Sequence, residues 1–290
     1  MRIFLTGATG FIGSAIVPEL VHAGHQVRGL ARSDAAAASL TKAGAEAQRG
    51  SLDDLESLRN GAAAADAVIH AGFHHDFSNY AAAALAGSGR RFIVTSGTAL
   101  AAAGGIATER DRRGRARFRV SAQIRRGRSF GCGAGRACFG AAPSPSVHGD
   151  GDHGFVPLLI GIAREKRVSA YVGDGMNRWP AVHRLDAARL YRLVLEKDSS
   201  ASRYHAVADE GVPFREIAQV IGRRLNIPVA SKSPEEAADH FGWFANFAGL
   251  DCPASSARTQ QQLGWRAMQP SLIADIDRPI YFETRQETRK

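Results

Sequence analysis

The chain has 290 residues, 44% of them hydrophobic, which is enough for one large domain or a domain with a smaller lobe. It has no apolar run of about 18 residues and no charged leader with a cleavage site, so we expect neither a membrane span nor a signal peptide. The three cysteines lack a zinc-like spacing, which favours a reducing, cytoplasmic location over a disulfide framework.

The net charge of +9 is concentrated in one segment. Between Asp111 and Asp150 the chain carries nine arginines and neither a lysine nor an acidic residue, so the rest of the chain is formally neutral. Residues 104–142 are anomalous, because they are rich in Arg, Gly and Ala and lack any helical or alternating apolar period. Three interpretations are open: a nucleic-acid-binding stretch, a flexible surface loop, or a GC-rich gene translated in a shifted reading frame. The composition favours the shifted frame, and a nucleic-acid partner is the weakest of the three.

The first hundred residues alternate between strand-like and helix-like patterns. We predict strands at residues 2–6, 26–31, 46–49, 67–72 and 91–96, and helices at 12–23, 34–43, 53–64 and about 77–87. Such alternation predicts an α/β fold with a parallel sheet covered by helices on both faces.

Ordinary patterning resumes at Pro143. Helices are predicted around 156–162, at 186–195 and at 214–225, and strands around 171–175 and at 204–207, before a small, mainly helical region that extends to about 265. We therefore divide the chain into a first domain at 1–160 and a C-terminal part at 161–290, which contributes the last strands and a lobe.

A glycine motif, TGATGFIG, occupies residues 6–13 between the first predicted strand and the first predicted helix. Gly7 permits a tight turn, Gly10 lets the backbone approach a ligand closely, and Gly13 lets the helix pack on the sheet. The helix N-terminus then offers free N–H groups and a positive dipole end to an anion. A second strand follows within about 30 residues, so the spacing predicts a site for a dinucleotide diphosphate.

With this motif the chain resembles the extended short-chain dehydrogenase/reductase family, also called NAD-dependent epimerase/dehydratases, in an atypical form. The resemblance also rests on Val-His-Arg-Leu-Asp at 182–186, Gly-Asp-Gly at 173–175 and Leu-Gly-Trp at 263–265. It implies a Rossmann-like, doubly wound parallel sheet with a small C-terminal, mainly helical substrate lobe. Residues 1–160 would then form the dinucleotide-binding domain, and 161–290 would carry the substrate lobe.

The resemblance implies a nicotinamide dinucleotide cofactor held by the glycine motif and by the ends of the next strands. An acidic residue after the second strand would favour NAD, but here Ala31 is followed by Arg32, whose guanidinium can meet a 2′-phosphate. We therefore expect NADP, with NAD as the alternative. The implied cofactor-binding residues are Gly7, Thr9, Gly10, Phe11, Ile12, Gly13, Arg32, Ser33, Asp53, Ala71, Gly72 and Phe73.

The Tyr-x-x-x-Lys pair that performs acid–base catalysis in this family is missing. None of the five tyrosines has a lysine four residues later, and the helix that would carry the pair falls within 104–142. The fifth predicted strand ends near Ser96 and Thr98, whose hydroxyls are the candidate catalytic groups. His148 is a candidate substrate contact. We predict no metal site, because the histidines near residues 70–75 lack a recurring ligand spacing.

Two classes of function are open. The first is an NAD(P)-dependent oxidoreductase or epimerase-like enzyme that acts on a small carbonyl or hydroxyl substrate, with the cofactor carrying the hydride. The second is an NADP-binding regulatory or sensor protein, or a catalytically defective family member, which keeps the cofactor loop without the Tyr-x-x-x-Lys pair. The expected partner is a small molecule rather than a membrane or a nucleic acid, and the sequence leaves the oligomeric state open.

Overall fold

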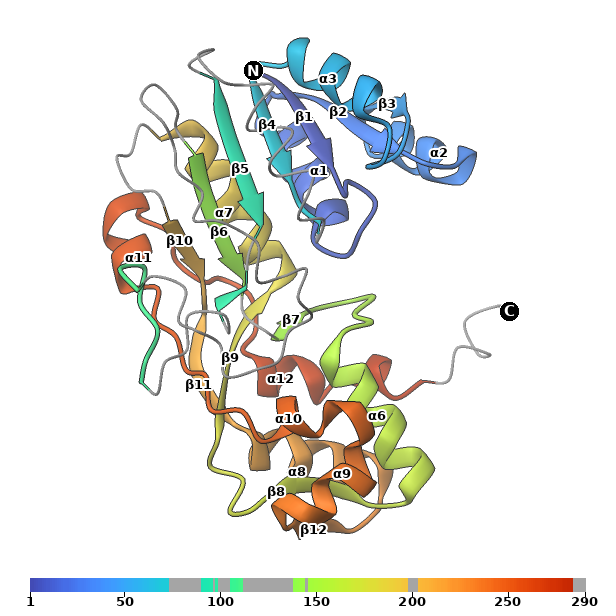
Figure 1. The fold of residues 1–290 in the computed structure, drawn as a ribbon, viewed down its shortest axis with the longest axis vertical. Helices are drawn as coiled ribbons and strands as arrows, with labels where there is room; N and C mark the ends of the chain where they lie inside the picture. The colour runs from blue at the N-terminus through green and yellow to red at the C-terminus, as the bar shows by residue number, and fades with distance from the viewer. Residues whose placement is uncertain are drawn as a thin grey trace.

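A parallel sheet organises the computed structural model, which describes residues 1–72, 90–95, 97–98, 105–111, 138–143, 146–197 and 203–283 (Figure 1). In spatial order the seven strands of this sheet are β10 (Arg203–Ala206), β6 (Cys138–Pro143), β5 (Arg91–Thr95), β4 (Ala67–His70), β1 (Arg2–Thr6), β2 (Gln26–Ala31) and β3 (Glu46–Arg49). Every neighbouring pair is parallel, so the carboxyl ends of all these strands meet at one edge.

The strand order reverses at β1. This strand pairs with β2 on one side and with β4 on the other, so that Ile3 lies opposite both Val27 and Ala67. A sheet of this topology has a crevice outside the carboxyl ends of its strands at the reversal, where open α/β sheets bind their ligands. The predicted Rossmann-like, doubly wound α/β fold is therefore confirmed, and the glycine motif leaves β1 at this crevice.

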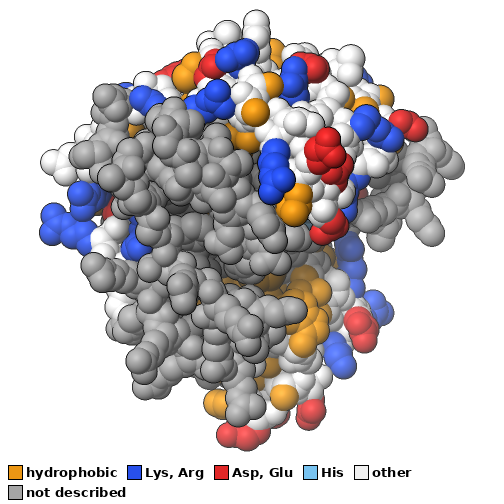
Figure 2. All heavy atoms as spheres, turned by 45° about the horizontal axis from the view of Figure 1, so that its top comes forward, with side chains coloured by type: hydrophobic (Ala, Val, Ile, Leu, Met, Phe, Trp, Pro, Cys, Tyr) orange, Lys and Arg blue, Asp and Glu red, His pale blue; other side chains and the backbone are white. Residues whose placement is uncertain are grey.

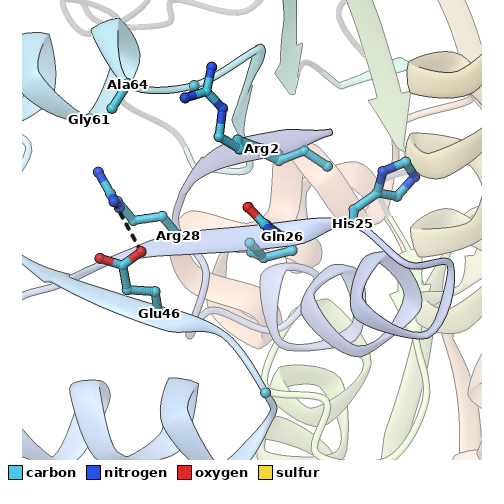
Figure 3. Close-up of a pocket in the computed structure, with 11 residues that line it drawn as sticks. Arg2, His25, Gln26, Arg28, Glu46, Gly61 and Ala64 are labelled. Carbon is cyan, nitrogen blue, oxygen red and sulfur yellow. Dashed lines mark ion pairs between the residues drawn. The ribbon is translucent and has the colours of Figure 1, made fainter.

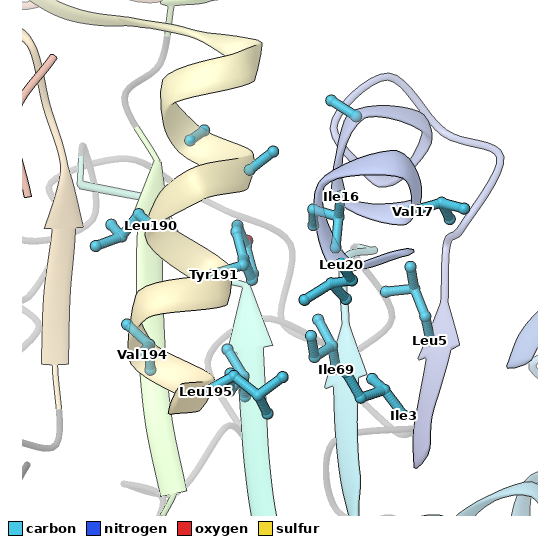
Figure 4. Packing of buried hydrophobic residues seen from close by; sticks show 14 of the residues in the cluster. Ile3, Leu5, Ile16, Val17, Leu20, Ile69, Leu190, Tyr191, Val194 and Leu195 are labelled. Atoms are coloured by element: carbon cyan, nitrogen blue, oxygen red, sulfur yellow. The ribbon is translucent and has the colours of Figure 1, made fainter. Parts of the chain in front are cut away.

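Helices cover both faces of the sheet, and the side-chain alternation of β1 decides which residues meet them. The helices of this half are α1 (Gly13–His22), α2 (Asp34–Lys42), α3 (Leu55–Ala63) and α7 (Arg184–Glu196). Ile3 and Leu5 share one core with α1 and α7, whereas Phe4 packs on the opposite face with α3. Figure 4 shows Ile16 of α1 and Leu190 of α7 on the same face of the sheet.

The C-terminal lobe is small and mainly helical, as predicted. It contains α6 (Phe155–Lys166), α8 (Phe214–Leu225), α9 (Pro234–Phe241), α10 (Ala245–Ala248), α12 (Leu272–Ile276), short 3-10 turns at Gly242–Phe244 and Pro279–Tyr281, and a small sheet of β8 (Ser169–Val172) and β12 (Val229–Lys232). Trp179 and Phe214 lie in its core with their ring centroids 4.9 Å apart. Aromatic burial therefore holds the lobe together.

A three-stranded sheet connects the lobe to the central sheet. Its strands are β11 (Asp209–Pro213), β9 (Arg178–His183) and β7 (Ser146–His148), and a further helix, α11 (Ala257–Leu263), packs against β10. β9 runs directly into α7, where the His183 side chain accepts a hydrogen bond from the Leu185 N–H at 3.3 Å. The boundary predicted at residue 160 falls inside α6.

Several predicted elements have the observed bounds, among them β1, β2, β3 and α8. The strand predicted at 67–72 ends at His70. The sequence did not indicate β9, because Pro180 lies inside it and proline disfavours a strand interior. The helix predicted at about 77–87 lies outside the described residues, and within them no helix is long and apolar enough to cross a membrane.

Candidate functional site

The glycine loop between β1 and α1 has no room for a side chain at two of its positions. Gly7 has a φ of +72°, and a Cβ there would lie 2.9 Å from both the carbonyl carbon and the oxygen of Ala71. A Cβ on Gly13 would lie 1.9 Å from the Gly7 carbonyl oxygen. Because the obstructing atoms are backbone, only glycine lets β1, α1 and the end of β4 come this close. The structure thus brings three predicted cofactor residues together at the crevice.

The same loop presents backbone N–H groups at the start of α1. Gly10 N donates to the Gly7 carbonyl at 3.0 Å, and Ser14 N donates to the Gly10 carbonyl at 2.8 Å. Ile12 is the N-cap, and no side chain of the described residues caps it. The first N–H groups of a helix lack intrahelical acceptors and form the positive end of its dipole. Thr9 and Gly10 are exposed, so an anion can reach these groups.

Both positively and negatively charged side chains lie at the carboxyl ends of β2 and β3. Arg32 is exposed directly after β2, whereas the Ser33 hydroxyl accepts a hydrogen bond from the backbone of α2 at 3.2 Å and so acts as its N-cap. Asp34 Oδ1 lies 3.1 Å from Arg49 Nη2 at the end of β3. Asp53 is exposed in the turn that follows. The predicted Arg32 and Asp53 therefore lie on open surface, while Ser33 has a structural hydrogen bond.

A buried polar network lies at the ends of β1, β4 and β5. Thr6 Oγ1 lies 2.6 Å from His70 Nδ1, and the Thr95 hydroxyl donates to the His70 carbonyl oxygen at 2.6 Å. The Thr95 and Tyr191 hydroxyl oxygens are 2.7 Å apart. Burial raises the pKa of the Tyr191 phenol far above its ordinary value. Tyr191 therefore keeps its proton, and its hydrogen bond with Thr95 links α7 to the end of β5.

Thr98 is the one candidate catalytic hydroxyl within the described residues. Its side chain is 1% exposed, and Oγ1 has no hydrogen-bond partner among the described residues. An unpaired buried hydroxyl costs about 1–3 kcal/mol, which an oxygen of a bound ligand would recover. Gly72 is half-buried at the end of β4. Phe73 and Ser96 lie outside the described residues, so their roles stay predictions.

His148 is fully buried in a cluster that joins β7 to α12. Its Nδ1 lies 2.8 Å from Asp275 Oδ2, which also accepts from the Tyr281 hydroxyl at 2.7 Å. Gly149 N donates to the Tyr281 hydroxyl at 2.8 Å, and Arg278 Nη2 lies 2.6 Å from Asp275 Oδ1. Burial raises the pKa of Asp275, but the hydrogen bonds from His148 and Tyr281 outweigh it, so the pKa stays below its ordinary value. A contact between His148 and substrate stays a prediction.

Sequence reasoning missed the residues that hold this cluster from the C-terminal end. Asp275 lies 127 residues beyond His148, and no local pattern links them. Reasoning from the residues also missed Arg184, although it is the x position directly after His183 in the Val-His-x-x-Asp motif. The position of Arg184 at the junction of a strand and a helix could have indicated a role at the sheet edge. The Arg184 side chain reaches Ser14 of α1, with 3.2 Å between Nη2 and Oγ.

A cavity of about 310 Å³ lies at the opposite, amino-terminal edge of the sheet (Figure 3). Arg2, His25, Arg28 and Glu46 are among its lining residues. The Arg28 guanidinium pairs with Glu46 at 3.0 Å, and Arg2 pairs with Asp66 at 2.7 Å. Because these cations already have acidic partners, the cavity lacks the free positive charge that a dinucleotide diphosphate needs. The candidate cofactor site is therefore the glycine loop.

The described surface mixes both signs of charge. Figure 2 shows Lys and Arg side chains interspersed with Asp and Glu around the upper part of one face. Within the described part of the chain, no group of three or more His, Cys, Asp or Glu side chains could hold a metal ion. The glycine loop, with the uncapped N-terminus of α1, is the part of the described surface whose backbone geometry fits an anionic ligand.

Comparison with known proteins agrees with this geometry. Residues 7–116 match a family model described as NAD(P)H-binding. The chain is 47% identical over 296 residues to an uncharacterized protein of Schizosaccharomyces pombe, covering 97% of this chain and 100% of the relative. It is 43% identical over 294 residues to an uncharacterized protein of Saccharomyces cerevisiae, covering 95% and 98%. Its fold is similar to that of a dTDP-glucose 4,6-dehydratase from Streptomyces venezuelae with NAD and DAU bound, with a TM-score of 0.73, 20% identity, and coverage of 99% and 98%.

Proposed function

Because the chain belongs to the extended short-chain dehydrogenase/reductase family and is an NAD(P)-binding protein, we propose that it transfers a hydride between NADP and a small carbonyl or hydroxyl substrate. The observation that carries this proposal is the glycine loop. A Cβ on Gly7 would lie 2.9 Å from the Ala71 carbonyl group, and a Cβ on Gly13 would lie 1.9 Å from the Gly7 carbonyl oxygen, so neither position has room for a side chain. This packing holds the N-terminus of α1 at the carboxyl end of β1, where a diphosphate can bind the free N–H groups of the helix.

The residues of this chain would orient the cofactor, and the nicotinamide would supply the hydride chemistry. The N–H groups from Phe11 to Gly13 would hold the diphosphate. Asp53 would border the adenine, and Ala71 and Gly72 would pass beneath the dinucleotide. These placements are what the family resemblance implies for the segments that follow β3 and β4.

Arg32 supports NADP over NAD. It is exposed directly after Ala31, the last residue of β2, which stands where an acidic residue would bind the ribose hydroxyls. A guanidinium there can bind the 2′-phosphate with two parallel hydrogen bonds. Arg49 lies nearby but is partly neutralised by Asp34 at 3.1 Å. Arg32 is therefore the residue proposed to select the cofactor.

Thr98 is the residue proposed to contact the substrate oxygen. Its buried hydroxyl has no hydrogen-bond partner among the described residues, and it lies one residue after Gly97, which occupies the position where this family places a hydroxyl. A hydroxyl can donate a hydrogen bond to a carbonyl oxygen while the hydride is transferred.

The test begins with titrations of NADPH and NADH followed by nicotinamide fluorescence. We expect tighter binding of NADPH. Arg32→Ala should weaken NADPH binding by about tenfold or more and leave NADH binding within about twofold, because one charge-assisted contact is lost. Arg59→Ala, an exposed arginine on α3, is the matched control and should leave both affinities unchanged. Equal loss of both cofactors in Arg32→Ala would contradict the assignment.

A second candidate function is a regulatory or sensor protein that binds NADP without turnover. The observation that favours it is the lack of any lysine four residues after the described tyrosines at 171, 191, 204 and 281. A panel of ketones, aldehydes and nucleotide sugars with NADPH separates the two. Binding of NADPH with no oxidation on any substrate favours the sensor, whereas no binding of either cofactor indicates a defective copy.

A further inference from the structure

Arg184 lies at the start of α7, beside the start of α1. The two helices begin at the same sheet edge and run side by side, and their far ends are joined by Arg192 and Glu19, with 2.6 Å between Nε and Oε1. At the near end, Arg184 Nη2 lies 3.2 Å from Ser14 Oγ. The Arg184 guanidinium carbon also lies 4.9 Å from the centre of the Phe11 ring, within the glycine motif itself.

The charge of Arg184 has no acidic partner among the described residues. Its Nη1 donates to the backbone carbonyl of Asp150 at 2.7 Å, while the Asp150 carboxylate pairs with Arg278 instead. Arg192 on the same helix, in contrast, pairs with two glutamates at 2.6 Å and 2.9 Å. Burial lowers the pKa of the half-buried Arg184 guanidinium, and the charge of the Asp150 carboxylate, which pairs with Arg278, offsets only part of this shift.

We propose that Arg184 is a cofactor-binding residue outside the glycine motif, and that its guanidinium contacts the diphosphate of the bound dinucleotide. This inference rests on the proposed dinucleotide site. A half-buried cation without an anionic partner, stacked on a ring of the anion-binding loop, is complementary to a doubly charged diphosphate. Arginine has five N–H donors, and the two hydrogen bonds that the described residues accept leave others for phosphate oxygens.

The same side chain would connect cofactor binding to the loop at residues 149–154, which leads from β7 into α6. Gly149 packs directly on Arg184, since a Cβ there would lie 2.9 Å from Arg184 Cγ. His153, in the same loop, contacts the Phe11 ring edge-on with 5.6 Å between centroids. A diphosphate held by Arg184 would therefore fix this loop against the glycine motif.

The experiment compares ligands that differ in the diphosphate. Wild type, Arg184→Met and Arg184→Lys are titrated with NADPH, with ADP-ribose, which keeps the diphosphate, and with adenosine, which lacks it. Adenosine binding is followed by ligand-observed NMR. The matched control is Arg215→Met, because Arg215 also stacks on an aromatic ring, Tyr171 at 5.4 Å, but lies on α8 in the C-terminal lobe.

We expect Arg184→Met to weaken NADPH and ADP-ribose binding by about tenfold or more and to leave adenosine binding within about twofold. Arg184→Lys should retain part of the affinity, because its charge remains but its fork of donors is lost. Arg215→Met should bind all three ligands like wild type. Equal weakening of adenosine and ADP-ribose, or no weakening of either, would overturn the proposal.

Folding and the proposed function are checked separately. The thermal midpoint of each ligand-free variant shows whether it folds. If Arg184→Met does not fold, the binding affinities of Arg184→Lys are compared with those of wild type instead. Failure of wild type to bind NADPH or ADP-ribose overturns the dinucleotide site itself. Normal wild-type binding with unchanged Arg184 variants overturns only the role of Arg184.

Discussion

Gly13 and Gly161 are both helical glycines, yet their surroundings differ completely. A Cβ on Gly13 would lie 1.9 Å from the Gly7 carbonyl oxygen, whereas Gly161 on the exposed side of α6 has nothing within 4 Å. The Gly7 carbonyl belongs to the backbone of a tight turn, so it cannot move aside as a flexible side chain could. The requirement for glycine at position 13 is therefore steric, and that at 161 is not.

We predict that Gly13→Ala lowers the free energy of unfolding by about 2 kcal/mol or more and abolishes NADPH binding, because the loop must open to accept the methyl group. Gly161→Ala should instead raise the free energy of unfolding by about 0.5–1 kcal/mol, since alanine restricts the unfolded chain. Urea denaturation and an NADPH titration measure both effects. A Gly13→Ala protein with wild-type stability and affinity would contradict the steric argument.

Ser33 marks the limit of residue-level prediction. The family resemblance implies a cofactor contact for Ser33, which follows Arg32, but in the structure its hydroxyl accepts a hydrogen bond from the backbone of α2 at 3.2 Å. A serine just before a helix is a common N-cap, so the local signal for the structural role was present. Whether Ser33 also contacts the cofactor stays a prediction.

Among the elements, α12 is joined to β7 by a buried hydrogen bond between His148 and Asp275. His148 and Asp275 side chains are 0% and 1% exposed, and the Tyr281 hydroxyl donates to the same Asp275 oxygen at 2.7 Å. Removal of one partner from such a pair leaves an uncompensated buried group, which costs several times more than an exposed ion pair contributes. This cluster of His148, Asp275 and Tyr281 therefore holds α12 against β7.

We predict that the cluster of His148, Asp275 and Tyr281 makes the free energy of unfolding fall as the pH is lowered into the acid range. The pKa of Asp275 is below its ordinary value of 3.8 in the folded chain, so its stabilisation is present above that value and is lost as the pH falls through the folded pKa. Asp275→Asn should lose about 2–4 kcal/mol near pH 7 and show a flatter decline in acid. Urea denaturation across the acid range measures both.

Asp277→Asn is the control for this prediction. Asp277 also has a lowered pKa, because it pairs with Arg223 and Arg224, but its side chain is 38% exposed. Solvent screens such a pair, so we expect this variant to cost less than about 1 kcal/mol near pH 7. Equal losses of stability in Asp275→Asn and Asp277→Asn would show that the burial of Asp275 does not increase its contribution.

At the scale of the whole molecule, residues 104–142 conflict with the sheet topology. β5 and β6 are parallel neighbours, with Phe92 opposite Cys138, so the chain must cross from one end of the sheet to the other between them. Parallel crossovers in α/β proteins are commonly helical. The sequence of this segment has no helical period and carries most of the excess positive charge of the chain.

We predict that resequencing the gene across this segment returns a different reading frame, with acidic residues and an apolar helical period between β5 and β6. A chain expressed from the corrected gene should have a net charge well below +9 and a higher thermal midpoint. An in-frame read identical to the printed sequence would contradict this prediction and leave the other interpretations of the segment.

Local sequence patterns were sufficient to predict many of the elements and the position of the glycine loop. Hydrophobic periodicity is a local property, so strands such as β1 and β2 and the helix α8 have the predicted bounds, and three glycines spaced three apart indicate the diphosphate site. The contacts between residues far apart in the chain could not be predicted in this way. Arg184 reaches Ser14 across 170 residues and Asp275 reaches His148 across 127, because the sheet edge and the docked lobe bring them together. Such contacts depend on packing between elements, which no local pattern records.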